Sequence, residues 1–349
     1  MNAPIIAFFN NKGGVGKTTL VYHLAWMLAY QGYRVVAADL DPQANLTASF
    51  LDENELERLW PETGTGPTIW GNIEPLHKGR PPGDITPANL LLVDKLPDVP
   101  GELALIPGDL GLSSFEDDLS SEWPKCLDGQ ERSFRVISAF GRLLQDAASR
   151  HRADVVLVDV GPNLGAINRS ALVASDFVVV PLAPDLFSLQ GLRNLGPRLR
   201  DWRREWQTRL DVFNRAPAVD FDLPSGSMQP LGYVVLGHGA RLNRPVQAYE
   251  RWMVRIPGVF RSSVLGTTQA QAPSVADDPY CLAQLKHYRS LIQLGMEAYK
   301  PIFALKPADG AFGGHMYAAQ RAYVDFRQLA DAIMERADRP VSGHQVAAS

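Results

Sequence analysis

Two lysines stand in a glycine-rich run near the start of the chain, FFNNKGGVGKTT at residues 8–19. Glycines let backbone N–H groups close around phosphates, and the start of a helix adds a favourable dipole. Lys17 can reach the β- and γ-phosphates of a nucleotide, and the Thr18 hydroxyl can bind Mg²⁺. The run therefore predicts a nucleoside triphosphate site with these contacts: Gly13, Gly14, Val15, Gly16, Lys17, Thr18 and Thr19.

A dinucleotide site is the rival interpretation of this loop, because Asp39 follows it at roughly the spacing that holds a ribose. However, GVGKTT lacks the third glycine of such a loop and carries a Lys-Thr pair that a dinucleotide does not need. We therefore favour ATP with Mg²⁺. The second lysine, Lys12, has no role in a simple phosphate loop.

The elements around the loop predict how it is held. Residues 5–9, IIAFF, form a continuous apolar run that is typical of a strand buried on both faces. The stretch TTLVYHLAWMLAYQG has helical spacing of apolar residues and ends at Gly32, after which RVVAADLD returns to strand. Strand, loop, helix and strand within about forty residues indicate a βαβ unit.

The loop departs from the general phosphate-loop pattern, since Asn11 stands where the first glycine is expected and Lys12 follows it. In this it resembles the deviant Walker A loop of the ParA/MinD family. The resemblance implies a homodimer that forms with ATP, in which Lys12 of each subunit reaches the phosphates bound by the other. A cation supplied in this way can stabilise charge on the γ-phosphate, so turnover would depend on dimerisation.

Two further motifs are similar to that family. In AADLDPQANLTASFL, Asp41 matches the carboxylate that orients the attacking water, and Asp39 matches the acidic residue near the metal. In ADVVLVDVGPN, Asp159 ends a buried strand where a carboxylate can hold Mg²⁺. The resemblance thus implies catalytic Lys12, Lys17 and Asp41, and a metal site of Thr18, Asp39 and Asp159. One departure is Gly161, where the family usually has proline.

The resemblance implies an α/β fold, a doubly wound, mostly parallel sheet carrying the deviant Walker A loop. We expect a P-loop ATPase domain over residues 1–300, with an acidic Pro/Gly-rich insertion at 52–100, and a helical extension with a polar tail at 301–349. YVVLGHGARLNR predicts a late strand and loop, and VFRSSVLG resembles the strand after it. The family's adenine-contact triplet is replaced there by Val264, Leu265 and Gly266.

Composition limits the classes of function. No apolar run approaches the roughly 20 residues that cross a bilayer, and the chain starts without a basic leader, so we expect a cytoplasmic protein. Two cysteines 155 positions apart suggest neither a disulfide framework nor a metal site. The apolar face of residues 324–337 is flanked by mixed charges, which favours a helix packed on the domain over a membrane anchor.

Charge is unevenly distributed within a net charge of −4. Residues 39–131 hold 19 acidic and 5 basic side chains, whereas residues 193–261 hold 12 arginines and 6 acidic residues. The arginine-rich region is where we expect nonspecific double-stranded DNA to bind through its phosphates. The candidate contacts are Arg241, Arg244, Arg251 and Arg255.

The expected function is that of a ParA-like ATPase in plasmid or chromosome partition or cargo positioning, associated with the nucleoid and stimulated by a centromere-binding or adaptor protein. Two alternatives stay open. One is a partner-regulated ATPase switch in a multi-gene system such as defence, without DNA binding. The other is an ATP-dependent ligase related to dethiobiotin synthetase, which generally lacks the second lysine.

Overall fold

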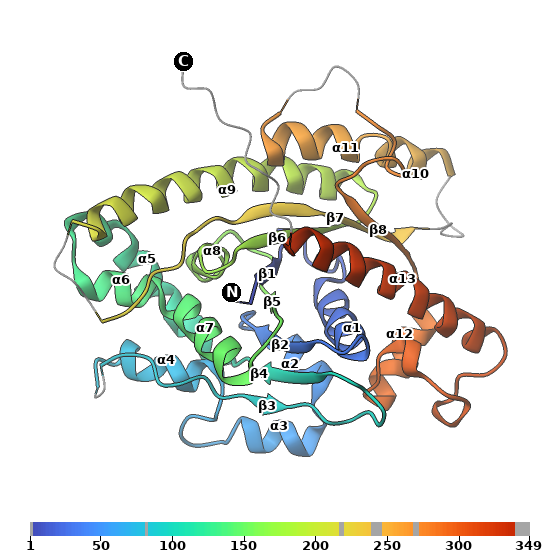
Figure 1. Cartoon of the computed structure of the whole chain (residues 1–349), viewed down its shortest axis with the longest axis horizontal. Coiled ribbons are helices and arrows are strands. Elements are labelled where there is room, and N and C mark those ends of the chain that lie inside the picture. Colours follow the sequence, from blue (N-terminus) through green and yellow to red (C-terminus); the bar gives the residue numbers. More distant parts are fainter. Residues whose placement is uncertain (1–2, 81–82, 216–219, 239–245, 268–271, 339–349) are drawn as a thin grey trace.

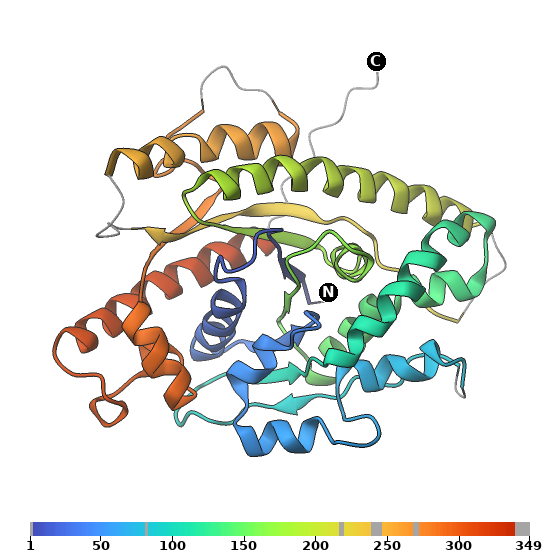
Figure 2. The ribbon, with the colours of Figure 1, turned by 180° about the vertical axis from the view of Figure 1, so that it is seen from behind.

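The structure of the protein is a computed structural model, and it describes residues 3–80, 83–215, 220–238, 246–267 and 272–338. In this part of the chain, helices cover both faces of a central eight-stranded sheet (Figure 1; Figure 2 shows the opposite side). In spatial order, the strands are β3 (Leu91–Leu92), β4 (Glu102–Ile106), β2 (Arg34–Asp39), β5 (Val155–Asp159), β1 (Ile5–Phe8), β6 (Phe177–Leu182), β7 (Gln229–His238) and β8 (Cys281–Lys286).

Parallel pairing joins all neighbouring strands except β3 and β4, which are antiparallel. In register, Asp159 at the end of β5 is opposite both Phe8 of β1 and Asp39 of β2. The carboxyl ends of these three strands therefore meet at one edge of the sheet. This confirms the predicted doubly wound α/β fold and brings the predicted motifs together at one place.

The two hydrophobic cores lie on opposite faces of the sheet. In the first strand, Ile5 and Ala7 belong to one core, whereas Ile6 and Phe8 belong to the other. Because both faces are buried, the strand is apolar throughout rather than alternating. One face carries α1 (Lys17–Tyr30), α2 (Asn45–Phe50), α3 (Glu53–Leu59), α12 (Arg289–Ala298) and α13 (Gly314–Asp338).

The other face carries eight helices within the described ranges: α4 (Ile69–His77), α5 (Phe115–Lys125), α6 (Glu131–Ile137), α7 (Ala139–His151), α8 (Ala166–Val173), α9 (Leu186–Phe213), α10 (Val246–Met253) and α11 (Ile256–Val259). Short 3₁₀ turns occur at Leu110–Ser114, Cys126–Asp128, Ile302–Ala304 and Pro307–Asp309, and a π-helix at Phe260–Leu265. The two views show α9 running along the outer side of β6 and β7 (Figures 1 and 2).

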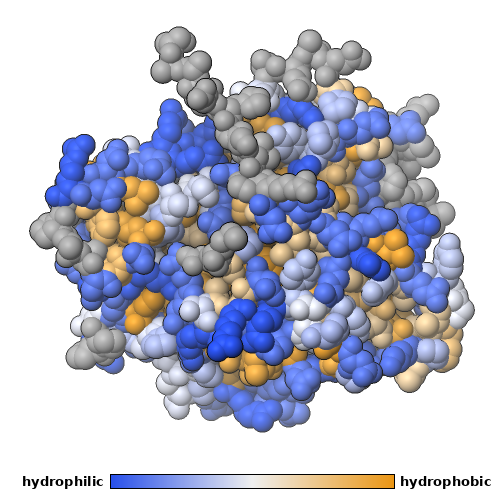
Figure 3. Space-filling view, in the orientation of Figure 1, coloured by the Kyte–Doolittle hydropathy of each residue, from blue (hydrophilic) through white to orange (hydrophobic). Residues whose placement is uncertain are grey.

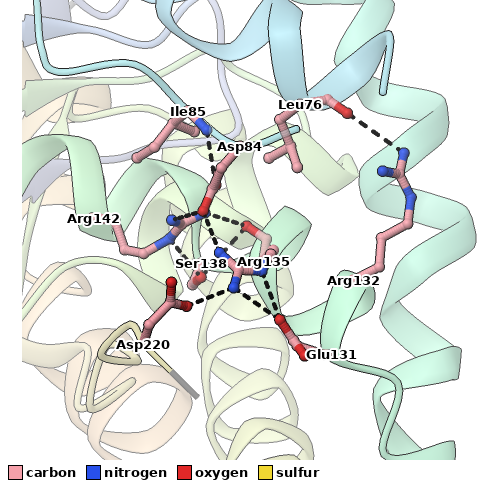
Figure 4. Close-up of polar contacts among 9 residues, drawn as sticks. All are labelled: Leu76, Asp84, Ile85, Glu131, Arg132, Arg135, Ser138, Arg142 and Asp220. Carbon is pink, nitrogen blue, oxygen red and sulfur yellow. Dashed lines mark hydrogen bonds and ion pairs between the residues drawn. The ribbon is translucent and has the colours of Figure 1, made fainter. Parts of the chain in front are cut away.

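Residues 52–100 contain more regular structure than their composition suggests. They form α3, α4 and the edge strand β3, and the α4 side chains of Ile69, Ile73 and Leu76 are completely buried. Farther along the segment, Asp84 accepts hydrogen bonds from Arg142 at 2.6 and 2.9 Å and forms an ion pair with Arg135 (Figure 4). The segment is thus packed onto the domain by both apolar and charged contacts.

The expected strand around Val264 is wrong. Residues from Ile256 to Leu265 form α11 and the π-helix, and the last strand begins only at Cys281. Phe260 and Val264 are buried against α9, so tertiary packing outweighs the β propensity of this stretch. Val264 therefore lies in the core rather than at a strand end facing a base.

The helix expected at 324–337 is the second half of α13, which lies beside α1 (Figures 1 and 2). Its apolar residues Phe326, Leu329 and Ile333 are buried in the same core as α1. This confirms the prediction of a helix packed on the domain. Among the described residues, no helix is both long and apolar enough to cross a membrane.

Candidate nucleotide site

The glycine-rich loop connects β1 to α1 and leaves the first turn of α1 open. Gly14 and Gly16 have φ angles of 70° and 91°, which favour glycine. Gly16 is the residue before the helix, and no side chain caps the helix start. A β-carbon at Gly16 would also lie 3.4 Å from the side chain of Leu236. The N–H groups of this turn can therefore receive an anion such as a phosphate.

Lys17 lies at the start of α1, with 7% of its surface exposed. Burial lowers the pKa of its ammonium group, and the negative charges of Asp159 and Asp41 oppose this shift. The side chains of Asp159 and Asp41 thus surround the lysine at the end of the sheet, and their negative charge favours its charged form. This is the environment expected for a cation that binds phosphates.

Thr18 and Asp159 form the predicted metal pair. The Thr18 hydroxyl donates to Oδ2 of Asp159 at 2.6 Å, and Oδ1 of this fully buried carboxylate has no partner. Burial raises the pKa of Asp159 to about 8, with a further contribution from the nearby Asp39. An orphaned buried oxygen is unfavourable unless something binds it. Hard cations take oxygen ligands, so the Thr18 and Asp159 oxygens fit Mg²⁺ together with nucleotide phosphates.

Asp39 has a different environment from Asp159. Its Oδ2 accepts from both the backbone N–H and the hydroxyl of Thr47 at 2.8 Å, and its Oδ1 accepts from the Asp41 N–H at 3.3 Å. Burial raises the pKa of Asp39 to about 7, and the Thr47 hydrogen bonds counter the shift. The geometry gives Asp39 a positioning role, and its contact with a metal stays a prediction.

Asp41 lies beside Lys17, and 7% of its surface is exposed. Its Oδ1 accepts from the Gln43 N–H at 3.0 Å and faces Gly161 in the loop after β5. A β-carbon at Gly161 would lie 3.4 Å from this oxygen. The structure therefore brings Asp41 into the same site as the P-loop lysine and Asp159. Within the described residues, no three His, Cys, Asp or Glu side chains form a metal site by themselves.

Lys12 is paired with a residue outside the phosphate loop. Its ammonium group forms an ion pair with Asp185 and lies 5.9 Å from the centre of the Phe187 ring. Asp185 also caps α9 by accepting from the Ser188 N–H at 2.8 Å. Lys12 is thus held on the start of α9, and it must exchange this partner before it can contact a phosphate.

Sequence reasoning missed three residues that shape the site. Glu116 of α5 accepts from the first two N–H groups of α8, at 2.6 and 2.8 Å. Asn168 of α8 donates to the carbonyl oxygen of Gly161 at 2.9 Å. Both hold the loop that follows Asp159. Only the third, Asp185, had a local signal, as an aspartate three residues before Ser188 at a helix start.

The DNA-contact candidates are only partly described. Arg241 and Arg244 lie outside the described residues. Arg251 and Arg255 are exposed, and their guanidinium groups lie 5.2 and 5.5 Å from the Trp252 ring centre. The surface over α9 is strongly hydrophilic (Figure 3, upper left).

Several other arginines of the arginine-rich region serve the fold. Arg203 donates to the Met228 carbonyl oxygen at 2.6 Å, and Arg209 to the Trp123 carbonyl oxygen at 2.9 Å. The tryptophans Trp202 and Trp206 of α9 are buried in the core. Much of this arginine content therefore stabilises the packing of α9.

Comparison with known proteins identifies the family. A family profile described as an AAA domain matches residues 3–212. The chromosome partitioning protein ParA of Caulobacter vibrioides is 31% identical over 214 residues, which are 60% of this chain and 66% of that protein. A Rhizobium rhizogenes protein that carries the name of a replication protein A is 35% identical over 224 residues, 59% of this chain and 50% of its own length. The chain thus spans about half the length of this curated relative.

Solved structures share the fold over nearly the whole chain. A Corynebacterium diphtheriae protein has a TM-score of 0.69 and 25% identity, covering 97% of this chain and 99% of its own. The ParA protein of pNOB8, in a structure with nonspecific DNA, has a TM-score of 0.58 and 18% identity, with coverage of 97% and 99%. The family profile covers more than half of the chain, and this protein therefore belongs to the AAA-domain ATPase family of the ParA/MinD type.

Proposed function

We propose that this protein is an ATPase that forms a homodimer with ATP and, as a dimer, associates with double-stranded DNA without sequence preference. The use would be plasmid or chromosome partition, or the positioning of another cargo on the nucleoid. The observation that carries the proposal is the set of Lys17, Thr18, Asp41 and Asp159 at one sheet edge, with Lys12 in an ion pair with Asp185 at the start of α9.

The surface around this edge supports dimerisation through it. Leu110 follows the carboxyl end of β4, and Leu186 and Phe187 follow that of β6. These three large apolar side chains are 61%, 50% and 71% exposed. Because the carboxyl ends of parallel strands lie at one edge, these side chains surround the nucleotide site, where a second subunit would bury them.

In this mechanism, the loop from Gly13 to Thr19 binds the phosphates of ATP, and Thr18 and Asp159 would hold Mg²⁺. When bound, the metal would neutralise charge on the phosphate oxygens. Asp41 orients the attacking water. Lys12 leaves Asp185 in the dimer and contacts the γ-phosphate in the other subunit, where it stabilises developing charge. Water attack breaks the bond between the β- and γ-phosphates and leaves ADP and inorganic phosphate. Departure of the inorganic phosphate then removes the charge that holds Lys12 in place, and the dimer opens.

The test uses an Asp41→Ala variant, which should retain ATP without hydrolysing it. Its binding to random-sequence duplex DNA is measured with ATP, with ADP and without nucleotide over a salt series. Tight binding only with ATP, weakening as salt rises, is the expected result. Dimerisation without DNA binding would refute the DNA function and favour a partner-regulated switch. ATP-dependent transfer to a small carboxylic substrate would instead favour a ligase.

The arginine contribution is tested in the same background. Alanine at Arg241, Arg244, Arg251 and Arg255 should flatten the plot of log affinity against log salt by about 0.9 for each DNA phosphate that is no longer neutralised. Arg204, which is exposed on α9 and paired with Asp201, provides the matched control. An unchanged slope in the fourfold variant would remove these residues from the DNA surface.

A further inference from the structure

A turn at Pro107–Asp109, directly after β4, is held on one side by the acidic segment 52–100. The Ile69 N–H donates to the Pro107 carbonyl oxygen at 2.8 Å. The Trp60 indole N–H donates to the Gly108 carbonyl oxygen at 3.1 Å. The Thr68 hydroxyl donates to the Asp109 carboxylate at 2.7 Å. Three consecutive residues are therefore fixed by residues 60–69.

On its other side, the same turn contacts the nucleotide site. The Gly108 N–H donates to the Thr47 hydroxyl oxygen at 2.7 Å. The Thr47 hydroxyl accepts this hydrogen bond and donates its own hydrogen to Oδ2 of Asp39, 2.8 Å away. The second oxygen of Asp39 accepts from the N–H of Asp41. A continuous series of hydrogen bonds thus leads from Trp60 to the backbone of Asp41.

Packing makes this connection stiff. Thr47 and Asp39 are fully buried. A β-carbon built on Gly108 would lie 2.8 Å from Cγ of Asp39, so the turn backbone lies directly on that carboxylate. A shift of the turn therefore cannot occur without displacing Asp39 or breaking its hydrogen bonds.

We propose that Trp60 is a positioning residue for ATP hydrolysis, acting through the Pro107–Asp109 turn, Thr47 and Asp39 on the loop that carries Asp41. This gives residues 60–69 of the acidic segment a task in turnover. The inference rests on the proposed function in one respect, namely that Asp41 orients the water. The side chain of Trp60 acts through its hydrogen bond to the Gly108 carbonyl oxygen.

The first test compares steady-state ATP hydrolysis of the full chain and its variants. Trp60→Phe keeps an aromatic ring at this position and removes the indole N–H. It should lower kcat about fivefold, the effect of one net hydrogen bond, with KM unchanged. Thr47→Val should lower kcat at least as much, whereas Thr47→Ser should restore it. Thr65→Val is the control, since Thr65 donates within the segment, to Glu74 at 2.9 Å.

The second readout needs no turnover. Amide hydrogen exchange at Gly108 and Thr47 in nucleotide-free protein should be faster in Trp60→Phe than in the wild type, and unchanged in Thr65→Val. Wild-type kcat in Trp60→Phe, or a rise in KM alone, would overturn the proposal. So would unchanged exchange. The wild-type protein could instead bind ATP without hydrolysing it, while amide exchange in Trp60→Phe changes as expected. This result would refute the proposed function and leave the positioning contact in place.

Discussion

His23 should make stability depend on pH in a way that reports how α13 is docked on α1. The ring is buried on α1, and its Nδ1 lies 2.7 Å from the Thr19 carbonyl oxygen. It stacks on Phe326 of α13 at 5.1 Å between ring centres, and its Nε2 has no partner. A carbonyl only accepts, so Nδ1 carries the proton and Nε2 is bare in an aromatic environment.

The magnitude follows from the shift in pKa. Burial lowers the pKa of His23 to about 4, and the hydrogen bond with the Thr19 carbonyl opposes the shift. The unfolded chain has an ordinary histidine pKa of about 6.5 and binds the proton first as the pH falls. The free energy of unfolding should therefore decrease by about 2 kcal/mol between pH 7 and pH 5 from this residue alone. The stabilisation is fully present above the unfolded-state pKa.

The assay is urea unfolding at pH 7, 6 and 5 for the wild type and His23→Asn, whose amide can donate to the same carbonyl but does not titrate. Burial also lowers the pKa of His151, and this residue contributes equally to the pH dependence of stability in both proteins. The asparagine variant should be less stable at pH 7 but should lose about 2 kcal/mol less on acidification. Parallel pH profiles would refute the reasoning, because they would mean that folding does not lower the pKa of His23.

Further predictions concern the site and its support. Lys12→Ala should keep nucleotide affinity in the monomer and abolish ATP-dependent dimerisation, whereas Lys17→Ala should weaken nucleotide binding itself. Titration with a fluorescent ATP analogue measures the binding, and light scattering measures the dimerisation. Normal dimerisation of Lys12→Ala would contradict the role of Lys12 in trans. Glu116→Ala should lower the free energy of unfolding, measured in urea, by about 1 to 2 kcal/mol, because the start of α8 is then uncapped. The control Asp117→Ala, at the exposed neighbouring aspartate, should leave the free energy of unfolding unchanged. Arg261→Leu leaves the carboxylate of Asp278 buried without its cation and should be destabilising by about 3 to 5 kcal/mol, less so when combined with Asp278→Asn.

The sequence alone predicted the first βαβ unit, the glycine-rich loop and the strand that ends in Asp159. These features depend on local chemistry. Gly16 needs a positive φ angle, β1 is apolar because both faces are buried, and Asp159 ends its strand. Parallel pairing then places carboxyl ends together by geometry, so motifs more than a hundred residues apart could be assigned to one site.

Only the tertiary structure decided the rest. The Pro/Gly-rich segment 52–100 forms helices because its apolar side chains find a core, and the stretch around Val264 becomes a π-helix because α9 covers it. The ion pair of Lys12 with Asp185 joins residues 173 positions apart, and no local pattern contains it. Apart from proline, local propensity differs by at most about 1 kcal/mol per residue, whereas burial of one large apolar side chain contributes roughly 1.5 to 3 kcal/mol. Long-range packing therefore decides wherever the two compete.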